Sequence, residues 1–144
     1  MTKEKTQDYE RKKRYLKRYK KNKELISRLE NKLVSLNDRI YKIKSPSYSD
    51  LPKGVPTVTI DDLISDKVEL EARIKRLTLK GKTLKSETLE IIDNVDDPRY
   101  AERLESFFID CKDFSTIADD TGYTERHIIR LYSEAIDSID IECQ

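Results

Sequence analysis

Residues 113–139 decide the fold of the C-terminal part of the chain, with the sequence DFSTIADDTGYTERHIIRLYSEAIDSI. Ala118 is small, Gly122 has no Cβ, and Ile128 and Leu131 are apolar. In this order, the residue types suit a close crossing of two helices, a left-handed turn, and the buried face of a second helix. The spacing therefore predicts a helix-turn-helix.

A second helix that opens at Thr124, whose hydroxyl can cap it, would present one face to solvent. The side chains that point away from its apolar positions are Glu125, Arg126, Ile129, Arg130 and Ser133. Arginine to guanine is the commonest specific contact to a base edge, and Arg126 and Arg130 lie one helical turn apart. We predict that Thr124 and this face enter the major groove of double-stranded DNA.

The stretch TERHIIRLYSEAI, residues 124–136, resembles the recognition helix of sigma-70 region 4, with Ala135-Ile136 in place of the usual Ala-Leu. Together with Arg99-Tyr100 to Phe108 and the stretch SPSYSDLPKG at 45–54, it resembles phage late-transcription regulators of the ArpU and RinA kind from Gram-positive hosts. The resemblance runs from about Ile43 to Ile139. It implies sequence-specific binding near a phage operon, usually as an activator of packaging, morphogenesis or lysis genes.

Residues 1–44 are predicted to form one basic coiled-coil helix. Their apolar residues follow a 4-3 spacing that only Asn22 interrupts: Tyr15, Tyr19, Ile26, Leu29, Leu33, Leu36, Ile40 and Ile43. A 4-3 spacing keeps one apolar stripe facing a partner helix. The prolines, serines and glycine of residues 45–59 predict a connector.

A second coiled-coil helix is predicted over residues 60–95, opening near Asp61 and Asp62. Its stripe consists of Ile60, Leu63, Leu70, Ile74, Leu77, Leu84, Ile91 and Val95, interrupted by Lys67, Gly81 and Thr88. A third helix is expected from Pro98 to Cys111, within a helix-turn-helix domain at 96–144. The predicted fold is all-α, a long N-terminal antiparallel helical hairpin or coiled coil followed by that domain. The two stripes could pair within one chain or between chains, and a homodimer is favoured.

The net charge of +1 conceals a gradient along the chain. Residues 1–44 hold 16 Lys and Arg against 6 Asp and Glu, whereas residues 93–144 hold 5 against 14. Because DNA binding draws affinity from cationic contacts to phosphate, we expect a basic arm to supply what the acidic C-terminal part lacks. The arm consists of Arg11, Lys12, Lys13, Arg14, Lys17, Arg18, Lys20 and Lys21.

The composition argues against an enzyme, a metalloprotein and a membrane protein. The chain has two cysteines, one histidine and no glycine-rich phosphate loop, so no catalytic, cofactor-binding or metal-binding residue is predicted. No apolar run reaches a membrane-spanning length, and a cytoplasmic location in a bacterial host is expected. Two alternatives remain. One is an interaction protein whose acidic C-terminal domain docks on RNA polymerase or another regulator. The other is a small terminase-like subunit, which the order of the two parts disfavours.

Overall fold

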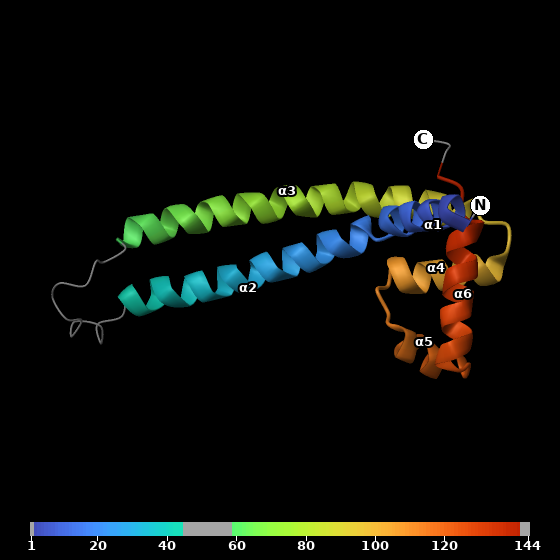
Figure 1. The fold of residues 1–144 in the computed structure, drawn as a ribbon. Helices are drawn as coiled ribbons and strands as arrows, with labels where there is room; N and C mark the ends of the chain where they lie inside the picture. Colours follow the sequence, from blue (N-terminus) through green and yellow to red (C-terminus); the bar gives the residue numbers. More distant parts are fainter. Residues whose placement is uncertain (1, 45–58, 142–144) are drawn as a thin grey trace. The chain divides into compact units, whose positions relative to one another are not determined.

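The computed structural model describes residues 2–44 and 59–141, and every regular element in these two ranges is an α-helix (Figure 1). The helices are α1 (Thr2–Leu16), α2 (Arg18–Lys44), α3 (Ile60–Asp93), α4 (Pro98–Phe108), α5 (Phe114–Thr121) and α6 (Glu125–Ser138). The all-α class predicted from the sequence is confirmed for these residues. The predicted connector at 45–59 lies, except for its last residue, outside the described ranges.

The prediction of one helix over residues 1–44 is wrong, because the helix is interrupted at Lys17. Backbone hydrogen bonds cross the break, from Lys17 N–H to the Lys13 carbonyl at 3.0 Å and from Lys21 N–H to the Lys17 carbonyl at 2.9 Å. Leu16, directly before the break, is fully buried in a core built mainly from the C-terminal helices. The first large apolar side chain before the break is thus buried in that core, and the helix is interrupted directly after it.

Two compact units organise the chain, with limits that differ from the predicted domains. Met1–Asn22 and Gly81–Gln144 form the first, here called the terminal unit, and Lys23–Lys80 forms the second, the two-helix unit. The predicted boundaries at residues 44 and 60 coincide with the end of α2 and the start of α3, but the compact units divide at residues 22 and 81 instead. The physical reason is that apolar residues from both ends of the predicted coiled coil are buried with the C-terminal helices.

The core of the terminal unit gathers residues from α1, the end of α3, and α4 to α6. Its buried members include Leu16, Ile91, Ile92, Leu104, Phe107, Phe108, Ile117, Ala118, Ile128, Leu131, Ala135, Ile136 and Ile139. The rings of Phe107, Phe114 and Tyr132 meet edge to face, with centroids 4.8 to 5.3 Å apart. The helix predicted to reach Cys111 ends at Phe108, since Ile109 turns into this core and Cys111 adopts a φ of 56°.

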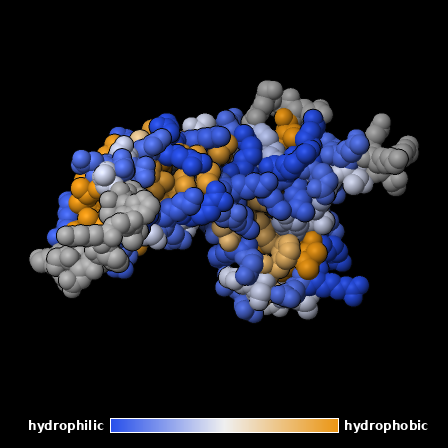
Figure 2. Space-filling view, turned by 60° about the vertical axis from the view of Figure 1, so that its left-hand side comes forward, coloured by the Kyte–Doolittle hydropathy of each residue, from blue (hydrophilic) through white to orange (hydrophobic). Residues whose placement is uncertain are grey.

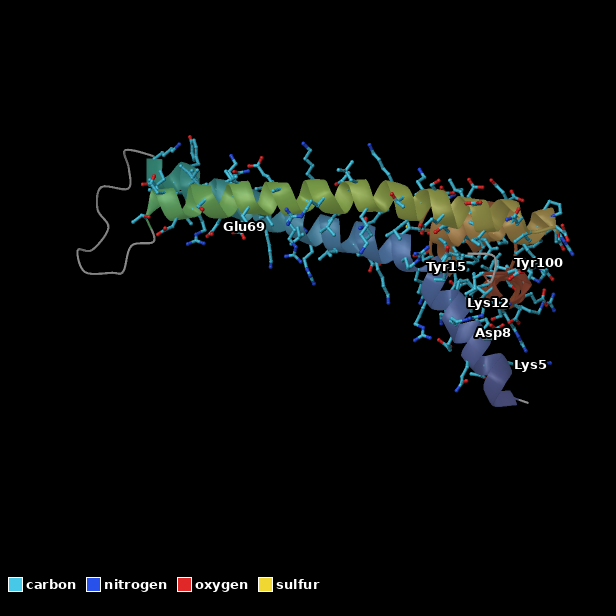
Figure 3. All side chains as sticks on the ribbon, turned by 90° about the horizontal axis from the view of Figure 1, so that it is seen from above. Lys5, Asp8, Lys12, Tyr15, Glu69 and Tyr100 are labelled. Atoms are coloured by element: carbon cyan, nitrogen blue, oxygen red, sulfur yellow. The ribbon has the colours of Figure 1, made fainter. Side chains whose placement is uncertain are left out.

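In the two-helix unit, α2 and α3 lie side by side and run in opposite directions (Figures 1 and 3). Among its described residues, only Leu29, Ile40 and Leu63 are buried apolar side chains. Several large apolar side chains are exposed instead: Val34, Tyr41, Ile43, Ile64, Val68 and Leu79. Figure 2 shows this apolar surface among charged side chains. In the described residues of this unit, apolar side chains meet between the two helices, but few of them are fully enclosed.

Two interruptions of the predicted stripes, Asn22 and Gly81, meet in the terminal unit. Asn22 is buried, and a Cβ added to Gly81 would lie 2.5 Å from the Asn22 Oδ1 atom. Glycine therefore permits the two helices to approach with a polar side chain between them. The third interruption, Thr88, is fully buried, and its hydroxyl donates to the Leu84 carbonyl at 2.8 Å.

Candidate nucleic-acid interface

A tight turn joins α5 to α6, and its local chemistry follows the sequence prediction. Gly122 has a φ of 77°, and its N–H donates to the Ala118 carbonyl at 2.9 Å. The hydroxyl of Thr124 accepts a hydrogen bond from the His127 backbone N–H at 3.1 Å. The left-handed glycine and the threonine cap, both predicted from the sequence, are confirmed. The turn thereby sets where the exposed face of α6 begins.

The N-terminal half of α6 presents an open surface. Ile128 and Leu131 are buried, so Glu125 and Arg126 project from the other side of the helix, and Ile129 is 47% exposed. Arg126 forms no ion pair with any residue that the structure describes. Its guanidinium is thus available to a ligand outside the chain.

Arg130, the second predicted base-contacting arginine, takes part in a line of contacts along α6. Its Nη2 lies 3.1 Å from His127 Nδ1, and its Nε lies 3.8 Å from Glu134 Oε1. The ring of His127 packs edge to face against Tyr123, with centroids 4.7 Å apart. Arg130 can contact DNA only after leaving these neighbours.

Tyr100 of α4 extends this line of contacts, and sequence analysis did not identify it as part of the site. Its hydroxyl donates to Glu134 Oε2 at 3.1 Å, and this bond raises the pKa of Tyr100, which Figure 3 labels, above its usual value. The spacing of His127, Arg130 and Glu134 along α6, with Tyr123 just before its cap, could have revealed their contacts. The contribution of Tyr100 depends on how α4 packs on α6, which no local pattern encodes.

The C-terminal half of α6 is covered by α1. The hydroxyls of Ser133 and Tyr9 lie 3.4 Å apart, and Lys12 Nζ donates to the Asp137 carbonyl at 3.0 Å (Figure 3 labels Lys12). Ser133 is therefore half-buried against α1, and its contact with the DNA groove stays a prediction. Beside it, burial raises the pKa of Tyr132 to about 12. The side of α6 that α1 covers is thus in its C-terminal half, where Glu134 and Asp137 on the other side remain exposed.

Three members of the basic arm are engaged within the terminal unit. Arg11 and Lys12 pair with Asp8 at 3.1 and 3.3 Å, and the hydrogen bond from Lys12 is the main cause of a lowered pKa for that carboxyl. Arg18 pairs with Glu87 at 2.8 Å and lies 3.8 Å from the centroid of the Tyr15 ring. The pairs with Asp8 lie within α1, whereas Arg18 joins the start of α2 to α3 and to the end of α1.

The other members of the arm fall into two groups. Arg14 and Lys21 are exposed. Lys13, Lys17 and Lys20 line a hollow beside Phe107, Phe114 and Tyr132, with Lys112 and Asp113 from the segment before α5. The basic residues that lie close together in the sequence are thus divided into three groups in the structure. One group pairs within the protein, one is exposed, and one lines the hollow.

Comparison with protein-family models, with curated proteins and with solved structures finds no match to this chain. In residues 2–44 and 59–141, no three His, Cys, Asp or Glu side chains are grouped so that they could hold a metal ion. None of the helices in the described ranges is long and apolar enough to cross a membrane. Because no matching protein indicates a function, a functional proposal rests on the side chains around α6.

Proposed function

We propose that the protein is a sequence-specific DNA-binding transcription regulator, composed of a helical hairpin and a C-terminal helix-turn-helix. In this proposal it acts in the cytoplasm of a bacterial host as a phage or prophage late-gene activator, in line with the family resemblance of residues 43–139. The α5 and α6 helices form the motif, and α6 is the recognition helix.

The observation that carries the proposal is Arg126 on the exposed N-terminal half of α6, which forms no ion pair with any described residue. Recognition helices contact base edges mainly with their N-terminal residues, and this is the half that α1 leaves uncovered. Glu125 and Ile129 lie on the same face. An unpaired guanidinium there can form the bidentate contact to guanine, whereas Arg130 must first leave His127 and Glu134.

Phosphate contacts in this proposal come from the arm residues that are not engaged within the protein. Arg14 and Lys21 are exposed, and Lys13, Lys17 and Lys20 form no ion pair with any described residue. Each phosphate contact releases counterions and strengthens binding without regard to sequence. The arm thereby offsets the excess of acidic residues in the C-terminal part.

The test is a mobility-shift assay on the protein's own upstream region with Arg126→Ala and Arg130→Ala. Arg126→Ala is expected to weaken cognate binding by about 1 to 3 kcal/mol, and Arg130→Ala by less. Arg76→Ala, which removes the same charge from an exposed position of the two-helix unit, serves as the matched control. Equal affinity of wild type and Arg126→Ala for the cognate site would contradict direct recognition by α6.

A second candidate function is docking on RNA polymerase or on the basic surface of another regulator. Its supporting observation is that Asp119, Asp120, Glu134 and Asp137 are all exposed on α5 and α6. A pull-down of host RNA polymerase with Asp119→Asn/Asp120→Asn, run beside the shift assay, separates the two functions. Loss of polymerase with unchanged DNA protection would favour docking.

We also propose that two copies of the chain associate through the two-helix unit. At 100° per residue, Val34 and Tyr41 lie on one flank of the α2 seam, and Ile64, Val68 and Leu79 lie on the corresponding flank of α3. Because the helices are antiparallel, these flanks form one apolar side. Exposed apolar surface of this extent is typical of an interaction site, and a second copy has helices of the same length to cover it.

The opposite side of the two-helix unit is a charged groove. Arg28, Lys32 and Arg39 from α2 line it, facing Asp66 and Glu69 from α3. Charged groups can remain hydrated there, whereas the apolar side gains from burial. The unit is therefore amphipathic across its width, and the apolar side is the one we assign to self-association.

A further inference from the structure

The terminal unit contains a hollow of about 280 Å³ whose aromatic lining the DNA-binding proposal does not explain. Its floor is formed by aromatic rings, among them Phe107, Phe114 and Tyr132. These rings are held by edge-to-face contacts with one another, so the floor is a preformed apolar surface. Below, this hollow is called the lysine–aromatic pocket.

Lysines surround the floor. Lys13, Lys17 and Lys20 follow one another at intervals of four and three residues across the break between α1 and α2, and Lys112 comes from the segment before α5. None of the first three forms an ion pair within the described ranges, whereas Lys112 pairs with Asp120 at 3.1 Å. Three neighbouring ammonium groups therefore lie at one hollow, and none of them is ion-paired with a carboxylate of the described residues.

The lining holds one acidic residue, Asp113, whose charge interacts with Lys20 but is outnumbered by the lysines. The carboxylate of Asp113 caps α5 by accepting the Thr116 backbone N–H at 2.7 Å. Burial, followed by repulsion from Lys13, Lys20 and Lys21, lowers the pKa of Lys17 below its usual value. Such repulsion is relieved when an anion binds among the lysines.

We propose that the lysine–aromatic pocket binds a nucleoside phosphate, with its phosphates among Lys13, Lys17 and Lys20 and its base against the aromatic floor. Ammonium groups bind phosphate through charge-assisted hydrogen bonds, and aromatic rings hold bases by stacking. The volume is at the lower end of the range of ligand pockets, which suits a mononucleotide rather than a dinucleotide. This proposal stands without DNA binding.

A duplex is a poorer occupant, because its bases are stacked within the helix and cannot reach the floor without being extruded. Duplex phosphates would contact the lysines alone. Dependence of binding on the rings therefore distinguishes a mononucleotide from a DNA backbone.

Calorimetry on the full chain can test the pocket with ADP, inorganic pyrophosphate and adenosine at one ionic strength. We expect ADP to bind at least about tenfold more tightly than either fragment, because only ADP uses both the lysines and the floor. Lys17→Gln should weaken ADP binding about tenfold through loss of one charge-assisted contact. Lys21→Gln, a neighbouring lysine outside the lining, should leave it within about twofold.

The floor is tested with Phe114→Leu, which keeps an apolar side chain at a half-buried position; circular dichroism verifies the fold. This variant should weaken ADP binding severalfold and leave pyrophosphate binding unchanged. Arg126→Ala should not alter ADP binding, so failure of DNA recognition and failure of the pocket are distinguishable. Pyrophosphate binding as tightly as ADP would overturn the proposal. It would also be overturned if Lys17→Gln weakened duplex binding for every sequence while no nucleotide bound the wild type.

Discussion

Buried apolar residues in the terminal unit come from five helices and form one enclosed core, whereas the two-helix unit buries only Leu29, Ile40 and Leu63 among its described residues. A pair of helices has two outer sides, so a seam alone cannot enclose its apolar groups. The comparison indicates that the terminal unit obtains its stability from internal packing. In the proposed self-association, a second copy would complete the burial of the two-helix unit.

The same substitution in the two units should have different effects on stability. Leu16→Ala removes a fully buried side chain from the terminal core and should lower the free energy of unfolding by about 3 kcal/mol. Leu77→Ala, at a half-buried seam position of α3, should lower it by about 1 kcal/mol. Urea denaturation followed by circular dichroism measures both. Equal losses would show that α1 is not part of the core.

Self-association is expected to depend on the apolar side of the two-helix unit. Val68 is 61% exposed, and Val68→Glu should raise the dimer dissociation constant by roughly 30-fold, or about 2 kcal/mol, because a carboxylate would be buried at the interface. Ser35→Glu introduces the same charge into the groove on the opposite side and should have little effect. Sedimentation equilibrium provides the measurement, and a strictly monomeric wild type at tens of micromolar would refute association.

The meeting of Asn22 and Gly81 can be examined with a double-mutant cycle. Gly81→Ala gains helix propensity but places a methyl group against the Asn22 side chain. In an Asn22→Ala background the clash is absent, so Gly81→Ala should become stabilising by up to about 1 kcal/mol. The expected coupling between the two sites is about 1 kcal/mol. Additive effects in thermal unfolding would mean that the helices do not approach at this point.

Acid should weaken the start of α4 and α5 more than that of α6. Hydrogen bonds from Arg99, chiefly its side chain, lower the pKa of the Asp97 carboxyl, and those from Thr116 lower that of Asp113. A lowered folded-state pKa means that each carboxylate stabilises the protein above pH 3.8, and that this stabilisation is lost as the pH falls through the folded value. Thr124 caps α6 with a hydroxyl, which does not titrate in this window.

The measurement is the unfolding temperature between pH 5.5 and 2.5 for wild type and Asp113→Asn. Asparagine also caps helices but remains neutral, so the variant should lose less stability on acidification. An unchanged acid slope would show that the Asp113 carboxylate does not contribute to the pH dependence.

Local interactions explain what could be predicted from the sequence. The Gly122 turn, the caps at Asp97 and Thr124, and the buried positions Ile128 and Leu131 depend on residues within four positions of one another. These features can therefore be recognised in the sequence without knowledge of the fold. Arg126 of the candidate interface belongs to this class, since helical periodicity alone directs it away from the core.

The other features of the fold and of the candidate site depend on packing between residues that are far apart in the sequence. The contact of Tyr9 with Ser133 joins residues 124 positions apart, and it determines how much of α6 is open. The grouping of Lys17 with Phe114 and the meeting of Asn22 with Gly81 likewise need helices from distant parts of the chain. The heptad pattern identified apolar residues that favour burial, but it did not identify the helices against which they pack. The reason is that the free energy of burial depends on apolar area and not on direction. The sequence by itself determined the helical segments and the polarity of their faces. The tertiary structure selected which faces meet and where α1 and α4 end, because those ends depend on burial in a core built from distant residues.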